Sequence, residues 1–166
     1  MKRIALLFCF LLAFTLAGCY SFSGASIPPN IRTFSVDFFP NRATMVNPTL
    51  SADFTNGLRS YISSRSSLRV TTESIPDIEI SGVITGYTLT PMAAGSDAQA
   101  QEQRFTITVK VDFANNVNTK DSFSQTFSAF RNFDSSIDFS AVEAGYVRQI
   151  IDELVDNIFM AAFGNW

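Results

Sequence analysis

Few side chains in this sequence could perform catalysis, because the 166-residue chain contains no histidine. Dyads and triads that rely on a histidine base are therefore excluded, as are histidine-ligated metal sites. The remaining candidates for hydrolytic chemistry are Asp77 with Glu79, Asp152 with Asp156, and the run Asp134-Ser135-Ser136. Asp152 and Asp156 fall on the side of a predicted helix opposite its apolar residues, so they are expected to face solvent. Neither Ser135 nor Ser136 has a nearby lysine that could activate its hydroxyl. The sequence therefore predicts neither an enzyme nor a cofactor or metal site.

Cys19 has a chemical role that its neighbours in the sequence predict. Lys2-Arg3 and the apolar run 4–16 precede it, a run shorter than the about 20 residues needed to cross a bilayer and typical of a secretion signal. The run Leu16-Ala17-Gly18-Cys19 resembles the lipobox of bacterial lipoproteins, in which the thiol carries diacylglycerol and the freed amine accepts another acyl chain. Two or more acyl chains give stable membrane anchoring.

We therefore expect residues 1–18 to be a lipoprotein signal peptide and residues 19–32 to be an acylated tether. Cys19 would then be the only cysteine left, so it would have no disulfide partner within the chain. An ordinary signal peptide with a cysteine near its cleavage site is the alternative. No Asp follows Cys19 directly, and in many bacteria an Asp there retains lipoproteins at the inner membrane. We expect an outer-membrane location, facing the periplasm.

The composition of the remaining chain predicts a single folded domain over residues 33–166. Cleavage after residue 18 would leave 10 basic and 15 acidic side chains, a net charge of −5. Such a chain is a poor general binder of nucleic acid or of anionic membrane surfaces. Charged residues make up only 16% of the sequence, whereas phenylalanine occurs 17 times, and this composition excludes a disordered chain.

Alternating apolar and polar residues predict five β-strands. Their expected ranges are 33–39, 68–72, 77–90, 105–113 and 122–130. In the first strand we expect Phe34, Val36 and Phe38 on one side. Gly82 and Gly86 share a face of the third strand, which predicts either a bulge or a helix packed closely against its backbone. Residues 92–103 are small and polar, so we expect a mobile hairpin loop there.

Two helices are predicted by apolar residues at 3.6-residue spacing. The first begins with Asn47 as N-cap and Pro48 as the first helical residue. Its stripe comprises Leu50, Phe54, Leu58, Tyr61 and Ile62. The second begins with Ser140 and Glu143 at capping-box spacing and ends near Gly164. The element order predicts an α+β fold, with both helices packed on one face of a mixed, mostly antiparallel sheet of four to five strands.

The sheet face opposite the helices should remain uncovered. Its expected residues are Thr106, Thr108, Lys110 and Asp112 in one strand, and Glu79, Ser81, Val83, Thr85, Tyr87 and Leu89 in another. Such a face is either exposed to solvent, as antiparallel sheets tolerate, or docks against a β-rich protein or an amphiphile.

Several stretches of the sequence resemble the LptE family of lipopolysaccharide-assembly lipoproteins. They are the lipobox with its continuation to residue 24, and residues 33–39, 47–51, 82–87, 106–111 and 127–166. The resemblance implies a small α+β domain tethered to the inner leaflet of the outer membrane. It also implies that the chain plugs the β-barrel LptD and assists its folding, that it binds lipopolysaccharide, and that it catalyses no reaction.

The negative charge of the chain departs from what a lipopolysaccharide binder requires, because lipid A phosphates bind cations. Arg104 and Lys110 are the best-placed candidate ligands, with ordinary surface charge as the alternative for each. The expected partners are LptD, lipopolysaccharide and the membrane that holds the acyl chains. The competing hypothesis is an unrelated outer-membrane-anchored scaffold or binding lipoprotein of the cell envelope.

Replacing the predicted acylated residue tests the anchor. We expect Cys19→Ser to leave a folded domain that no longer fractionates with membranes, because the acyl chains would be lost. Membrane fractionation and immunoblotting measure this, with Cys9→Ser as the matched control inside the segment expected to be removed. An unchanged membrane fraction for Cys19→Ser would contradict the lipobox assignment.

Overall fold

A computed structural model describes residues 27–45, 47–72, 75–92 and 102–164. Its elements are β1 (Thr33–Val36), α2 (Leu50–Arg65), β2 (Arg69–Val70), β3 (Ile78–Pro91), β4 (Glu102–Asn115), the short 3-10 helix η2 (Thr119–Asp121), β5 (Phe123–Asp134) and α3 (Phe139–Phe163). The predicted signal peptide, Cys19 and most of the predicted loop at 92–103 lie outside the described residues. All five expected strands and both expected helices are present.

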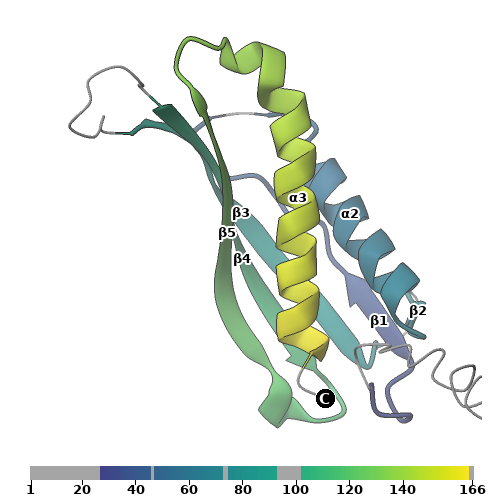
Figure 1. Ribbon diagram of the computed structural model, residues 1–166. Coiled ribbons are helices and arrows are strands. Elements are labelled where there is room, and N and C mark those ends of the chain that lie inside the picture. The colour runs from purple at the N-terminus through teal and green to yellow at the C-terminus, as the bar shows by residue number, and fades with distance from the viewer. Residues whose placement is uncertain (1–26, 46, 73–74, 93–101, 165–166) are drawn as a thin grey trace, which may run out of the picture.

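The five strands form one mixed sheet in the order β2-β1-β3-β4-β5. β1 pairs in parallel with both β2 and β3, whereas β3, β4 and β5 form an antiparallel meander. Helix α2 connects β1 to β2, as parallel strands require a crossover. Figure 1 shows α2 and α3 side by side against one face of this sheet, which confirms the α+β fold predicted from the sequence.

The core lies between the helices and the inner face of the sheet. Strand β4 contributes Phe105, Ile107, Val109, Val111 and Phe113, all buried as their alternation predicts. The helices contribute buried residues at 3.6-residue spacing, among them Leu50, Phe54, Leu58 and Ile62 from α2 and Val147, Ile150, Leu154 and Ile158 from α3. Both apolar stripes therefore face the sheet, as predicted.

The first strand ends earlier than predicted, and Phe38 faces solvent although it was expected on the same side as Phe34 and Val36. β1 stops at Val36, Phe38 is 63% exposed, and Phe39 is fully buried instead. Beyond β1 the chain still follows the edge of β3, where the Ile84 amide donates to the Pro40 carbonyl at 3.0 Å. Pro40 has no amide proton to donate, so the regular ladder and its strict alternation cannot continue through this segment.

A bulge in β3 changes which residues lie on the outer face, so the prediction for this face is wrong beyond the bulge. The pairing with β4 shifts register between Ile84 and Gly86, so the residues after the shift change sides. Tyr87 is therefore buried, and Leu89 is partly buried against the core, although both were expected on the outer face. The glycine pair did predict an irregularity in this strand, and the register shift confirms it.

The close packing of β4 and Phe39 against β3 requires a glycine at position 82. A Cβ at this position would lie 2.1 Å from the Lys110 carbonyl oxygen and 2.5 Å from the Phe39 ring. Gly82 thus packs against a neighbouring strand and a loop residue. The helix that the sequence offered as one explanation of the glycine pair does not contact Gly82.

The helix starts differ from the predictions. Helix α2 begins at Leu50, two residues after the predicted Pro48, although the Asn47 side chain still accepts hydrogen bonds from the amides of Thr49 and Leu50. Helix α3 is capped by Asp138, whose side chain accepts from the Ser140 amide at 3.0 Å. The predicted capping box is therefore wrong, whereas the predicted end near Gly164 is confirmed.

The two glycines Gly82 and Gly145 give a matched test of packing. Gly82→Ala should lower the free energy of unfolding by at least about 1–3 kcal/mol, because the new methyl group overlaps backbone and ring atoms. Gly145→Ala should raise it by up to about 1 kcal/mol, because nothing lies within 4 Å and alanine favours the helix. Urea unfolding measures both, and a neutral Gly82→Ala would refute the close packing of β3 against Lys110 and Phe39.

Candidate functional site

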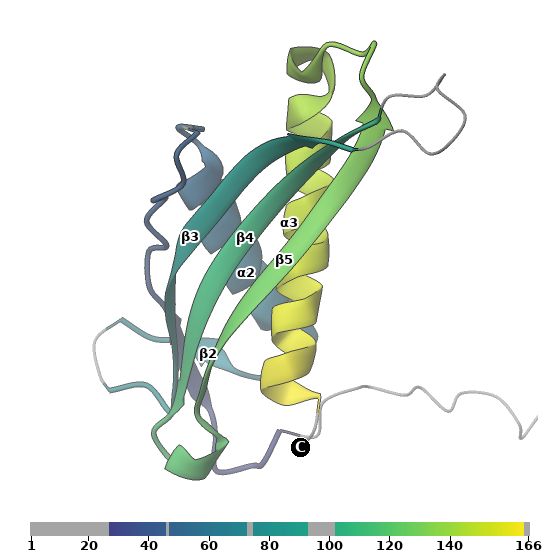
Figure 2. The same cartoon turned by 90° about the vertical axis from the view of Figure 1, so that its left-hand side faces the viewer.

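The outer face of the sheet, which the helices leave uncovered, is rich in hydroxyl groups. Across the β4–β5 pair its residues lie opposite one another as Thr106 with Phe130, Thr108 with Ser128, Lys110 with Thr126 and Asp112 with Ser124. The hydroxyls of Thr108 and Ser128 are hydrogen bonded at 2.9 Å. Figure 2 shows this face in front of the helices. It is a polar surface that can donate and accept hydrogen bonds in many directions.

Arg104 and Lys110, the predicted ligands of phosphate, share this outer face but are not brought together. They are six positions apart along β4, about 20 Å at the usual rise of a strand. The Arg104 guanidinium lies 4.1 Å from the centre of the Phe130 ring, and its Nε donates to the Asn132 side chain at 3.0 Å. Arg104 is therefore held in one orientation, whereas Lys110 is exposed and its side chain makes no hydrogen bond or ion pair with a described residue.

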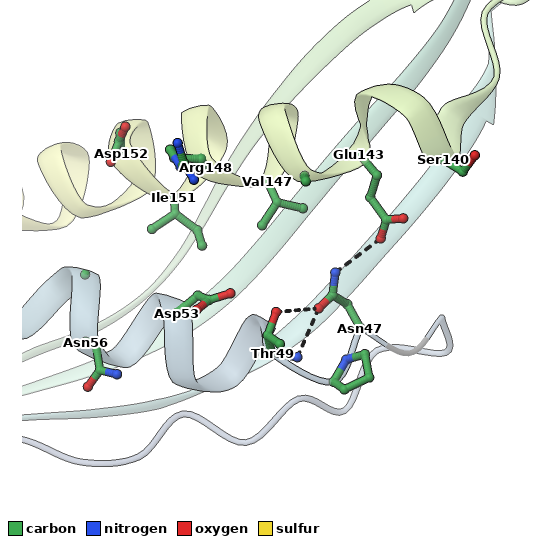
Figure 3. A pocket seen from close by; sticks show the side chains of 13 residues that line it. Asn47, Thr49, Asp53, Asn56, Ser140, Glu143, Val147, Arg148, Ile151 and Asp152 are labelled. Carbon is green, nitrogen blue, oxygen red and sulfur yellow. Dashed lines mark hydrogen bonds between the residues drawn. The ribbon is translucent and has the colours of Figure 1, made fainter.

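A groove with a volume of about 730 Å³ lies between α2 and α3 (Figure 3). Its apolar lining includes Gly57, Ala144, Val147 and Ile151. A Cβ on Gly57 would lie 3.2 Å from the Ile151 side chain, so this glycine lets the helices approach closely. The sequence analysis did not predict this groove, because it forms only when faces of two distant helices are packed together.

The rim of the groove carries more negative than positive charge. Asp53 projects from α2, while Glu143, Arg148 and Asp152 project from α3 (Figure 3). Asp53, Arg148 and Asp152 are exposed, and their side chains form no hydrogen bond or ion pair with any described residue. The ion pair between Arg131 and Glu153, at 2.7 Å, lies outside the groove.

One end of the groove is closed by a hydrogen-bond network of three residues. The Tyr87 hydroxyl donates to the Glu143 carboxylate, and the Asn47 amide donates to both at 3.2 Å. Burial, and then the bond to Glu143, raises the pKa of Tyr87, so the phenol stays protonated and remains a donor at neutral pH. The network joins β3, α3 and the residue that begins α2.

The described residues give few further hints of chemistry. Over 27–45, 47–72, 75–92 and 102–164, no three histidine, cysteine, aspartate or glutamate side chains are grouped as metal ligands would be. None of the helices in these ranges is both long enough and apolar enough to cross a bilayer. Cys19, the predicted lipid-attachment residue, lies outside them.

Comparison with known proteins gives a family match, which the geometry alone does not provide. The family model named LptE, with the description lipopolysaccharide-assembly, matches residues 31–162. A search among curated proteins found no match. Among solved structures, a minor lipoprotein of Acinetobacter baumannii has a TM-score of 0.52 at 16% identity, with 80% of this chain and 94% of that chain covered. Rare lipoprotein B of Shewanella oneidensis has a TM-score of 0.55 at 9% identity, with 78% and 92% covered.

A third solved structure, lipoprotein B of Nitrosomonas europaea, has a TM-score of 0.53 at 14% identity and covers 77% of this chain and 79% of its own. At such low identities these three structures support the fold alone. The family match is the stronger finding, because it spans every strand and nearly all of α3.

Removing the Tyr87 hydroxyl tests the network that closes the groove. Tyr87→Phe keeps the buried ring but leaves Glu143 and Asn47 without their partner on β3, so we expect the free energy of unfolding to fall by about 1–3 kcal/mol. Tyr61→Phe is the matched control, because Tyr61 also donates to a carboxylate, that of Asp156, but near the surface. Its loss should stay below about 1 kcal/mol. Equal losses in urea unfolding would argue against a special role for the network.

The same variant has a pH signature. Because the folded-state pKa of Tyr87 is raised, its contribution to stability is complete below the ordinary pKa of 10.0 and declines as the pH rises above it. Tyr87→Phe should therefore show a shallower alkaline decline in stability than the unmodified chain.

Proposed function

Because the chain belongs to the LptE family of lipopolysaccharide-assembly proteins, we propose that it is a lipoprotein component of the outer-membrane lipopolysaccharide translocon. In this role it acts as plug and assembly factor for the β-barrel LptD. The role requires binding and shape rather than catalysis.

The observation that carries the proposal is the extent of the family match. Residues 31–162 begin just before β1 and end in the last turn of α3, so the match includes both helices and all five strands. A match limited to one helix or one hairpin would support only a common structural motif. A match over the whole domain supports a common role.

The polar outer face of the sheet is compatible with a position inside a barrel. The interior of an outer-membrane barrel is polar, whereas its lipid-facing surface is apolar. Hydroxyl groups such as those of Thr106, Thr108, Ser124, Thr126 and Ser128 can pair with either donors or acceptors across such an interface. This face therefore docks against a polar wall without leaving many unpaired charges buried.

The acyl chains on Cys19 would serve the same role. Attachment to the membrane confines the domain to the surface in which the barrel is embedded, and this raises the effective concentration of one for the other. The predicted tether, residues 19–32, connects the anchor directly to β1.

Lipopolysaccharide is the second ligand in this proposal, and Arg104 is its best candidate contact. The guanidinium is already oriented by Phe130 and Asn132, so little side-chain entropy is lost when it binds a phosphate. Lys110 offers a second cation on the same face, free of any ion pair with a described residue.

Co-purification from native outer membranes tests the proposal. The full chain with an affinity tag, extracted in mild detergent, should bring down a large β-barrel identified as LptD by mass spectrometry. Recovery of the chain alone, or with peptidoglycan or a secretion complex, would contradict the plug role and favour the scaffold hypothesis.

The same preparation tests the lipopolysaccharide contact. The double variant Arg104→Gln with Lys110→Gln should reduce the lipopolysaccharide bound per complex by about tenfold, since charge-assisted bonds to phosphate are strong. Lys120→Gln, in η2 and outside this face, is the matched control. Unchanged lipopolysaccharide with an intact complex would remove these two residues from the proposal.

A further inference from the structure

We propose that the groove between α2 and α3 receives a polypeptide segment of the barrel partner, one that presents an arginine or lysine beside an apolar side chain. This inference rests on the proposed function and names a second surface, besides the outer face of the sheet, that contacts the partner. It follows from the lining of the groove, its charge and its rigidity.

The lining of the groove has the character of a peptide-binding surface. A volume of about 730 Å³ falls in the range of sites that enclose a small ligand or a few side chains. Val147 and Ile151 are buried residues that border it, and Ala144 and Gly57 add no polar groups. An apolar side chain of a partner can therefore lie on this floor and be shielded from water.

The charge of the rim selects a cation. Three carboxylates, those of Asp53, Glu143 and Asp152, are opposed by the single guanidinium of Arg148. Asp53 and Asp152 come from different helices and have no cationic partner among the described residues. An arginine or lysine entering between the helices would compensate this excess and fix the register of the segment that carries it.

The same charge argues against lipopolysaccharide as the occupant. The phosphates of lipid A are anionic and would approach three carboxylates with only one nearby cation. Arg104 and Lys110, the cations proposed for phosphate, lie on the outer face of the sheet. The helices α2 and α3, whose residues line the groove, lie on the opposite side of the sheet (Figures 1 and 2). The partner segment in the groove and the lipid would thus bind on opposite sides of the sheet.

The groove is held in shape before any partner arrives. The Tyr87–Glu143–Asn47 network fixes one end, and the close contact at Gly57 and Ile151 fixes the distance between the helices. A site that is already formed loses little conformational entropy on binding, so a short segment is sufficient for a specific contact.

Site-specific photocrosslinking in cells tests this inference. A photoreactive amino acid at Asn56, an exposed residue of the groove, is introduced into the full-length tagged chain. We expect it to crosslink to a peptide of the barrel that contains arginine or lysine. Crosslinks only to lipopolysaccharide, only to a second copy of the chain, or to nothing would overturn the proposal.

Charge variants supply the second readout. Asp53→Asn combined with Asp152→Asn should lower the crosslink yield from position 56 by at least about threefold, because the partner's cation loses its counter-charges. Arg148→Gln should raise the yield, because it removes the competing cation, and a general folding defect could not produce an increase. Asp112→Asn, on the outer face, is the matched control and should change nothing at position 56. An unchanged yield in the double variant would refute the electrostatic basis of the contact.

The two proposals fail in different ways. If the tagged chain recovers the barrel but position 56 does not crosslink to it, the plug role stands and the groove assignment falls. If no barrel is recovered at all, both fall.

Discussion

The register shift between Ile84 and Gly86 determines how the helices are held against the sheet. Up to the shift, Ile80 and Ile84 face the helices, and after it Tyr87 takes over that side. A phenol hydroxyl is thereby presented to the first turns of α3, where Glu143 accepts its hydrogen bond. Asn47 joins the same pair from the segment that begins α2. Both helix starts are therefore fixed at one polar point, and the groove between them follows from that arrangement.

Much of the fold could be predicted from sequence because its strongest signals are periodic. The alternation in β4 and the apolar stripes of α2 and α3 extend over many residues, so no local irregularity could obscure them. The prediction that Tyr87 lies on the outer face was wrong, because strict alternation assigns every residue after a bulge to the opposite face of the sheet. Glu143 was misassigned for a related reason: a local capping pattern competed with a tertiary partner 56 residues away, and the partner prevailed.

The candidate site was less predictable than the fold. Lys110 was correctly placed on the outer face, because that face depends only on the alternation of β4. Arg104, which precedes the predicted strand, shares this face because β4 already begins at Glu102. The groove had no sequence signal, since Asp53 and Asp152 belong to helices whose relative orientation is set by the packing of the whole core. In the sequence, Asp53 and Asp152 each resemble the solvent-exposed side of a separate helix, and only the folded structure places them in one groove.

The position of β1 in the sheet also has a consequence for the order of assembly. β3, β4 and β5 form an antiparallel meander from neighbouring segments, whereas β1 must pair with β3 across a long loop, Phe34 lying opposite Ile78. Closing a long loop costs more chain entropy than forming a hairpin, so the meander is favoured to form first. Strand β1, which follows the tether, then pairs with β3 after the meander has formed, and β2 can join the sheet only with β1 or after it, because β1 is its neighbour in the strand order. Until β1 pairs, the edge of β3 and the apolar layer beside it stay exposed to water, so the domain is complete only when its first strand is in place.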